Sequence, residues 1–309
     1  MDQHRGWRRR HRATRPLGRL PPSQDRRALR GSGPLSAADL PTPDELLAEI
    51  DATQPAAGEL RLWWLGQHSF ILKSHEALLY IDPFLTDIDG RLIPPLLRPT
   101  DLAHADLICG THDHADHIDR PAWPVIAGAS DKPRFAVPEL LLPSLAGELN
   151  MPRERFVGLD DGVSITVKDV KITAIPAAHE FLDRDEATGR YPYLGLIFES
   201  GGRCVYHAGD TCLYRGLHER LDRWRFDLML LPINGRDAER LKANIIGNMT
   251  YQEAADLAGE MDTVAVMPTH WDMFAANPGD PDAFERYMHI KYPHVMVMRP
   301  PYGRGRPVS

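Results

Sequence analysis

Three histidines and three aspartates lie within nine residues, 111–119, directly after an apolar run. Imidazoles packed this closely repel one another when they are protonated. A bound metal cation avoids this repulsion, because it takes the lone pairs of neutral rings. Imidazole nitrogens and carboxylate oxygens are ligands of divalent ions such as Zn²⁺ and Mn²⁺. On an extended segment, His112 and His114 point the same way. Asp116 and His117, on the turn that follows, can face a second position nearby. The segment, which we expect to open a helix, is therefore predicted to bind metal.

Further nitrogen and oxygen donors follow other predicted strands. No cysteine belongs to the set, whereas thiolate ligands are typical of structural zinc. The donor set therefore favours a catalytic metal site over a structural one. The alternative is a chance cluster of surface residues, and the number and spacing of the donors argue against it. The additional donors are His179, His207, Asp210 and His270.

Short apolar runs bounded by Gly, Asp and Ser turn signals predict the strands that position these donors. Helices are predicted at 42–50 and 250–260, because each begins with a Thr and a Glu spaced as a capping box. The first three strands are expected to form an antiparallel meander. The strands are predicted at 60–65, 69–73, 77–81, 106–109, 163–167, 170–175, 193–199, 203–207, 227–231 and 263–267.

The predicted strands fall into an early and a late group along the chain. Several buried strands end where a cluster of His, Asn or Asp begins. We therefore expect an α/β protein in which two sheets pack face to face under covering helices, with the polar loops gathered along one edge.

The order of the donors resembles that of a known family. The chain is similar to the metallo-β-lactamase superfamily over residues 59–275, through the His-x-His-x-Asp-His motif at 112–117 and the ordered partners Asp82, His179, Asp210 and His270. The branch that contains the L-ascorbate-6-phosphate lactonases looks most similar. The segments that carry this likeness are 60–74, 111–119, 206–211 and 268–274.

The resemblance implies a four-layer αββα sandwich of the α/β (α+β) class, with the site at one edge of the two sheets. It also implies a role for each donor. The first metal ion would be held by His112, His114 and His179. The second would be held by Asp116, His117 and His270. Asp210 would bridge the two ions, and Asp82 would orient a ligand from behind.

The implied activity is that of a metal-dependent hydrolase with two divalent ions, most readily Zn or Mn, although Fe also suits these ligands. Two divalent ions bridged by Asp210 would lower the pKa of a bound water from about 15.7 towards roughly 7, so that metal-bound hydroxide could attack the substrate. Asp116 is expected to hold and move the proton. The predicted substrate is a lactone or a similar small ester. The alternative is a small-molecule or phospholipid-type phosphodiesterase on the same dinuclear site.

Five residues among the donors or near them each have two interpretations. His207 is either a general acid or a packed histidine at a strand end, and His68 either contacts substrate or belongs to a turn. Asn234 and Arg236 either bind a carboxylate or phosphate of the substrate or lie in a solvated loop. Trp271 lines either the substrate pocket or the core.

The composition indicates the class of protein and limits the partners that it could bind. The 309 residues, 43% hydrophobic and 26% charged, are typical of a folded globular protein. Residues 1–30 hold ten Arg, two Asp and no Lys or Glu, a charge of +8; because the whole chain carries −7, residues 31–309 carry −15. Such an acidic body argues against a nucleic-acid partner. We expect residues 1–40 to be a disordered Arg- and Pro-rich extension and residues 41–309 to form the hydrolase domain.

Cysteine usage and hydropathy predict a cytoplasmic protein. Cys109, Cys204 and Cys212 are odd in number and form no CxxC pair, which is typical of a reducing compartment. No apolar run suits a signal peptide or a membrane span. The expected partner is a small-molecule substrate, and the sequence is compatible with a homo-oligomer formed through a helix such as 250–260. The intact His114 argues against a diiron redox protein of the same superfamily.

Overall fold

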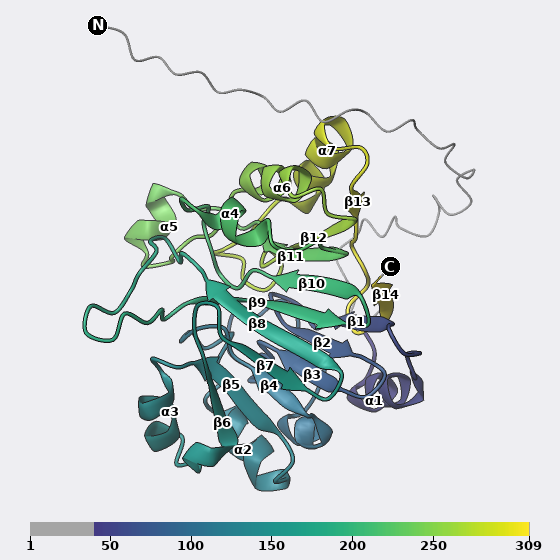
Figure 1. Ribbon diagram of the computed structural model, residues 1–309, viewed down its shortest axis with the longest axis vertical. Helices are drawn as coiled ribbons and strands as arrows, with labels where there is room; N and C mark the ends of the chain where they lie inside the picture. The colour runs from purple at the N-terminus through teal and green to yellow at the C-terminus, as the bar shows by residue number, and fades with distance from the viewer. Residues whose placement is uncertain (1–39, 309) are drawn as a thin grey trace, which may run out of the picture. The chain divides into compact units, whose positions relative to one another are not determined.

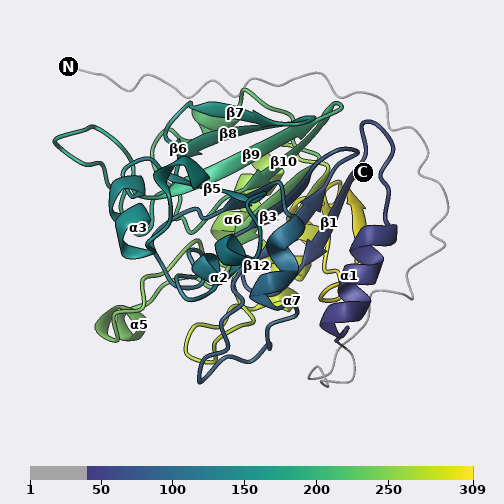
Figure 2. The ribbon, with the colours of Figure 1, turned by 90° about the horizontal axis from the view of Figure 1, so that it is seen from below.

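The computed structural model of the protein describes residues 40–308. The predicted disordered extension therefore lies outside the described residues, except for its last position. The described chain forms two seven-stranded sheets that face each other and carry helices on their outer sides (Figures 1 and 2). This arrangement confirms the αββα architecture expected from the sequence.

The first sheet combines antiparallel and parallel pairing. In order across the sheet, its strands are β14 (Arg306–Val308), β1 (Leu60–Trp64), β2 (Phe70–Lys73), β3 (Leu78–Ile81), β4 (Leu107–Cys109), β5 (Arg134–Pro138) and β6 (Phe156–Leu159). β1 to β3 form the predicted antiparallel meander, in which Leu62 lies opposite Leu72. β3 to β6 pair in parallel, and β14 pairs antiparallel with β1.

The second sheet is likewise mixed. In order across the sheet, its strands are β13 (Met296–Val297), β12 (Ala265–Thr269), β11 (Leu228–Pro232), β10 (Arg203–His207), β9 (Leu194–Ser200), β8 (Val170–Pro176) and β7 (Ser164–Val167). β10 to β13 pair in parallel, whereas β7 to β10 pair antiparallel. The parallel half of each sheet supplies strand ends that point in one direction.

Helices cover both outer faces. They are α1 (Pro43–Ala52), α2 (Ala122–Ala129), α3 (Leu142–Glu148), α4 (Leu217–Leu221), α5 (Ala238–Lys242), α6 (Tyr251–Glu260) and α7 (Pro281–Lys291), with 3-10 turns η2 (Pro99–His104) and η3 (Arg153–Arg155). In Figure 1, α4, α6 and α7 lie over the second sheet, and α1, α2 and α3 lie by the first. Within residues 40–308, no helix offers the eighteen-residue apolar stretch that a bilayer span requires.

Two buried apolar clusters hold these layers together. The larger one joins the inner faces of both sheets, so that Leu72 of β2 and Phe198 of β9 belong to it, and it continues to α1 through Leu46. The smaller one fills the space between the second sheet and its helices, with Tyr206 of β10 and Leu257 of α6 as members. Removal of this apolar surface from water is the main force that fixes the layers.

The ten predicted strands and both predicted helices are confirmed to within two residues at each end. α1 and α6 begin with the expected capping boxes, at Thr42 and Thr250. The prediction that a helix opens within residues 111–119 is wrong, because this segment is a series of bends and turns and α2 begins only at Ala122. β5 escaped prediction because Pro133 and Pro138 at its two ends resemble loop signals.

Candidate metal centre

The candidate donors follow strands that run in the same direction. β3 and β4 are parallel, as are β10, β11 and β12, and β8 runs with β10 because both are antiparallel to β9. Carboxyl ends of parallel strands meet at one edge of a sheet, where ligand sites are commonly built. Asp82 follows β3, residues 111–119 follow β4, His179 follows β8, Asp210 follows β10 and His270 follows β12. The topology therefore brings distant parts of the sequence to one edge.

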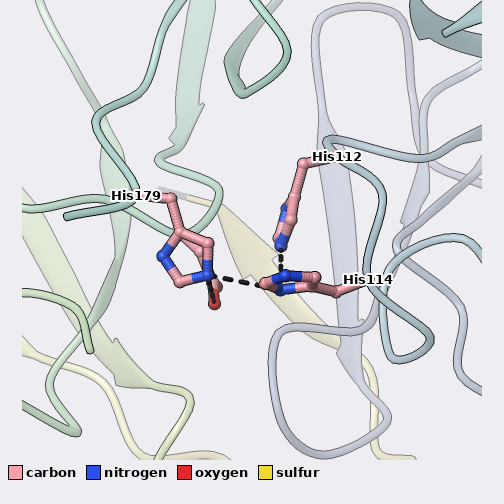
Figure 3. A group of neighbouring side chains, drawn as sticks. His112, His114 and His179 are labelled. Carbon is pink, nitrogen blue, oxygen red and sulfur yellow. Dashed lines mark hydrogen bonds and ion pairs between the residues drawn. The ribbon is translucent and has the colours of Figure 1, made fainter. Parts of the chain in front are cut away.

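A first group of donors consists of His112, His114, His179 and Asp210, whose ligand atoms all lie within 4.8 Å of one another. The three rings turn nitrogen atoms toward a shared point (Figure 3). His114 Nδ1 lies 3.0 Å from His112 Nε2 and 3.3 Å from His179 Nε2. Burial lowers the pKa of all three imidazoles, that of His179 to about 4. Neutral rings with converging lone pairs fit a divalent cation.

A second group consists of Asp116, His117 and His270, again with ligand atoms within 4.8 Å. Asp116 Oδ2 lies 3.6 Å from His117 Nε2 and 3.5 Å from His270 Nε2. Burial alone would lower the pKa of both imidazoles, but the carboxylates of Asp210 and Asp116 outweigh it. The pKa of His117 is raised to about 9 and that of His270 well above its ordinary value. Without metal, these two rings therefore carry protons.

Asp210 faces both groups. Its Oδ1 lies 3.4 Å from His117 Nε2, and its Oδ2 lies 3.1 Å from His270 Nε2 and 3.7 Å from His179 Nε2. Among residues 40–308, neither Asp210 Oδ1 nor His117 Nε2 has a hydrogen-bond partner, and both atoms are buried. Buried polar atoms are rarely left unpaired, so these two fit a missing cation. The seven nitrogen and oxygen donors at this edge are thus able to bind metal.

Asp82 contacts His117 of the second group at the ring nitrogen that does not face the other donors. Its carboxylate accepts hydrogen bonds from the backbone N–H and the hydroxyl of Thr111, at 2.8 and 2.7 Å, and lies 2.5 Å from His117 Nδ1. The proton on His117 Nδ1 therefore faces Asp82, which leaves Nε2 directed at the centre. Asp82 thus lies beside a candidate ligand, and its role in orienting that ligand stays a prediction.

Two histidines that were predicted as site residues lie near the centre but have no solvent-exposed surface. His68 and His207 are 0% exposed, and their ring centroids lie 3.9 Å apart. His207 Nδ1 accepts from Gly209 N at 3.3 Å, so Nε2 donates to His68 O at 2.9 Å. Burial lowers the pKa of both rings. His207 is thus the packed histidine at the end of β10, and His68 lies in the turn between β1 and β2, which is the second of the two interpretations given for each residue. Neither ring is exposed to contact substrate or to act on it as an acid.

The predicted substrate residues are occupied by other contacts. Arg236 forms a two-pronged ion pair with Glu253 of α6, with both N–O distances at 2.7 Å. Asn234, 2% exposed, hydrogen-bonds the side chains of Asn248 and Asn277. Trp271 Nε1 donates to Pro268 O at 3.1 Å, and its ring packs against both apolar clusters, as the core interpretation of this residue has it. These contacts fix the loops around the centre, and substrate binding by these residues stays a prediction.

Gln67 is a site residue that sequence reasoning missed. Its side-chain Nε2 lies 2.9 Å from Asp116 Oδ2 and 3.1 Å from His270 Nε2. The one signal in the sequence was a polar Gln in the short turn between two apolar strands, and that turn is followed by no donor cluster. Its proximity to residues 116 and 270 is tertiary and leaves no trace in local patterning.

Comparisons with known proteins agree with the fold and with the family resemblance. Residues 79–271 match the family described as the Beta-lactamase superfamily domain. A UPF0173 metal-dependent hydrolase of Methanoculleus marisnigri is 31% identical over 229 residues, which cover 74% of this chain and 88% of the relative. Another from Pyrococcus abyssi is 27% identical and covers 78% of this chain and 97% of the relative.

Solved structures support the same architecture. A metallo hydrolase of Ignicoccus hospitalis has a TM-score of 0.60 at 21% identity, covering 81% of this chain and 98% of that one. An isothiocyanate hydrolase from Delia radicum gut bacteria has a TM-score of 0.61 at 16% identity, covering 80% and 98%. At these identities the likeness concerns the fold.

Proposed function

Because this chain belongs to the metallo-β-lactamase superfamily and, within it, to the UPF0173 metal-dependent hydrolases, we propose that it cleaves a lactone or a similar small ester with two divalent ions. Its family makes it a metal-dependent hydrolase, and the substrate and the number of ions are the proposal. The observation that carries the proposal is the position of Asp210, whose two oxygens face His117 and His270 on one side and His179 on the other.

The divalent ions and the carboxylates of Asp210 and Asp116 have distinct roles in this proposal. The two donor groups would hold divalent ions, Zn or Mn by preference and Fe by the same ligand chemistry, which would supply the Lewis acidity that activates water and polarises the substrate's oxygen. Asp210 would be a ligand shared by the two positions. The Asp116 side chain is 18% exposed, whereas those of His117, Asp210 and His270 are at most 4% exposed. Asp116 is therefore the carboxylate placed to take up a proton and release it to solvent.

The test is metal analysis of the purified protein combined with hydrolysis assays in the same metal states. Metal-free protein is loaded with Zn²⁺ or Mn²⁺, bound metal is counted, and turnover is measured with a panel of lactones and with bis-p-nitrophenyl phosphate. We expect about two ions per chain and lactone turnover. Turnover of the phosphodiester alone would support the phosphodiesterase alternative, and a protein that binds no metal would overturn the assignment of the site.

A matched pair of variants sharpens this test. Asp210→Asn keeps the size of the side chain and removes its charge, so it should lose bound metal and turnover while remaining folded. Asp44→Asn makes the same change at an 82% exposed carboxylate that pairs with Arg98, and it should keep both. Full turnover by Asp210→Asn with unchanged metal content would contradict the proposal.

We also propose that residues 41–309 form one hydrolase domain that works in the cytoplasm. In support of a reducing environment, Cys109, Cys204 and Cys212 are all free and buried. Burial raises the pKa of each thiol, which keeps them in the inert protonated form. Assembly into a homo-oligomer stays a prediction.

A further inference from the structure

Gln67 is held by hydrogen bonds on both sides of its backbone. Its N–H donates to Asp272 Oδ1 at 3.0 Å. Its carbonyl oxygen accepts from the backbone N–H of His270 at 3.0 Å and from Trp64 Nε1 at 3.2 Å. Every polar group of this peptide unit is therefore used, and two of the three partners come from the segment that contains a candidate metal ligand.

The partners of Gln67 are themselves fixed. Asp272 accepts a second hydrogen bond, from the hydroxyl of Tyr302 at 2.8 Å. The ring of Tyr302 stacks on Trp64, with centroids 4.4 Å apart and planes 25° apart. All of these side chains are buried. The result is a closed network around the turn between β1 and β2, which leaves Gln67 little freedom to move.

The backbone of Gln67 adopts a left-handed conformation, with φ at +52°. This conformation is strained for a residue with a Cβ, which keeps it only where the surroundings impose it. His270 and Asp82, at φ +60° and +47°, share this feature, and all three lie at the candidate centre. Clustering of such residues is typical of sites where side-chain direction matters.

The side chain of Gln67 is directed into the second group. Its Nε2 lies 2.9 Å from Asp116 Oδ2, and 3.3 and 3.1 Å from the two ring nitrogens of His270. A carboxylate only accepts hydrogen bonds, so the amide atom beside it must be the nitrogen and not the oxygen. Asp116 Oδ2 is also the oxygen that faces the Nε2 atoms of His117 and His270. The amide therefore binds the one atom of Asp116 on which the second group converges.

We propose that Gln67 is a positioning residue that holds Asp116 Oδ2 in place for the second metal ion, an inference that rests on the proposed two-metal function. Hydrogen bonds to a charged acceptor are stronger and more directional than neutral ones. Outer residues that orient metal ligands typically contribute 10–100-fold to metal affinity or activity. The first group has no contact with Gln67 among the hydrogen bonds of the described residues, so its affinity should not depend on this amide.

The test is a Co²⁺ titration of the metal-free full-length protein, followed by calorimetry and by visible absorption. Gln67→Met keeps the length of the side chain and its backbone cost but cannot donate. We expect the second binding step to weaken by roughly 10–100-fold and the first to stay unchanged, with an altered absorption band for the second ion only. Gln67→Gly, in which the left-handed conformation costs nothing, should give the same loss in the second step and guards against misfolding of the first variant.

Thr269→Val is the matched control. Thr269 is fully buried next to His270, and its hydroxyl has no hydrogen-bond partner in the part of the chain that the structure describes, so its removal should leave both binding steps intact. Equal weakening of both steps in the Gln67 variants, or no weakening of either, would overturn the inference. If wild-type protein binds fewer than two ions, the proposed function fails first. If it binds two ions and the Gln67 variants do the same with equal affinity, only this inference fails.

Discussion

Asp82 Oδ2 lies 2.5 Å from His117 Nδ1, and both side chains are completely buried. The two residues come from different strands, since Asp82 follows β3 and His117 belongs to the loop after β4. Parallel pairing of β3 with β4 brings these loops together. The contact sets which ring nitrogen of His117 carries a proton, and so which one is free to bind metal.

Replacement of Asp82 by Asn should weaken metal binding by the second group roughly 10–100-fold, because the charged acceptor for the His117 Nδ1 proton is lost. Asn has the same shape and tolerates the left-handed backbone at this position, so the metal-free protein should keep its fold. The measurement is competition with a chelator of known affinity, alongside thermal unfolding of metal-free protein. Unchanged affinity would show that Asp82 does not orient the imidazole.

Loss of single ligands should change metal stoichiometry in steps. His114→Ala removes the nitrogen on which the first group converges, and His270→Ala removes a ring of the second. Each variant should bind about one ion per chain where the wild type binds two, because a divalent site seldom survives the loss of one of three or four ligands. Elemental analysis after gel filtration checks this. Loss of both ions in each variant would mean that the two groups act as a single site.

Metal binding by the two groups should depend on pH differently. The pKa values of His117, about 9, and of His270 are raised, so both rings carry protons at neutral pH and must release them to a metal. Affinity for the second ion should therefore fall as pH drops below 9, by up to roughly 100-fold per pH unit when two protons are displaced. The first-group imidazoles have lowered pKa values, that of His179 about 4, so the first ion should bind equally well at pH 7 and 9.

Calorimetry in buffers of different ionisation enthalpy counts the protons released in each binding step. The expected count at pH 7 is about two for the second ion and about none for the first. Ionisation of a metal-bound water adds at most about one proton to a step. A first step that releases more than this, or a second step that releases none, would contradict the charge states inferred from the pKa shifts.

Local sequence patterns predicted much of this fold, but few of the contacts that hold the donors and their loops in place. The meander of β1 to β3 alternates apolar runs with short turns, and the 112–117 motif concentrates its donors in one loop, so both are visible along the chain. For Arg236 the sequence left two interpretations open, anion binding and a solvated loop. Its pairing with Glu253 depends on how α6 packs, which no local pattern encodes. Gln67 was missed for the same reason.

The backbone just before Asp210 offers a test of how tightly the centre is built. Gly209 has φ at +61°, and a Cβ there would lie 2.3 Å from the carbonyl oxygen of Leu194. Gly209→Ala therefore adds a backbone clash to the conformational cost. We expect it to lower the free energy of unfolding by more than about 2 kcal/mol and to displace Asp210, with loss of metal from both groups.

Gly216 provides the matched comparison. Its φ is +96°, but a Cβ there meets no atom within 4 Å, so Gly216→Ala carries the conformational cost alone, about 1 kcal/mol. Chemical denaturation of both metal-free variants, followed by metal counting, separates the two effects. Metal content should be normal for Gly216→Ala and low for Gly209→Ala. If both variants lose stability equally and keep two ions, then the close approach of residue 209 to β9 does not position Asp210.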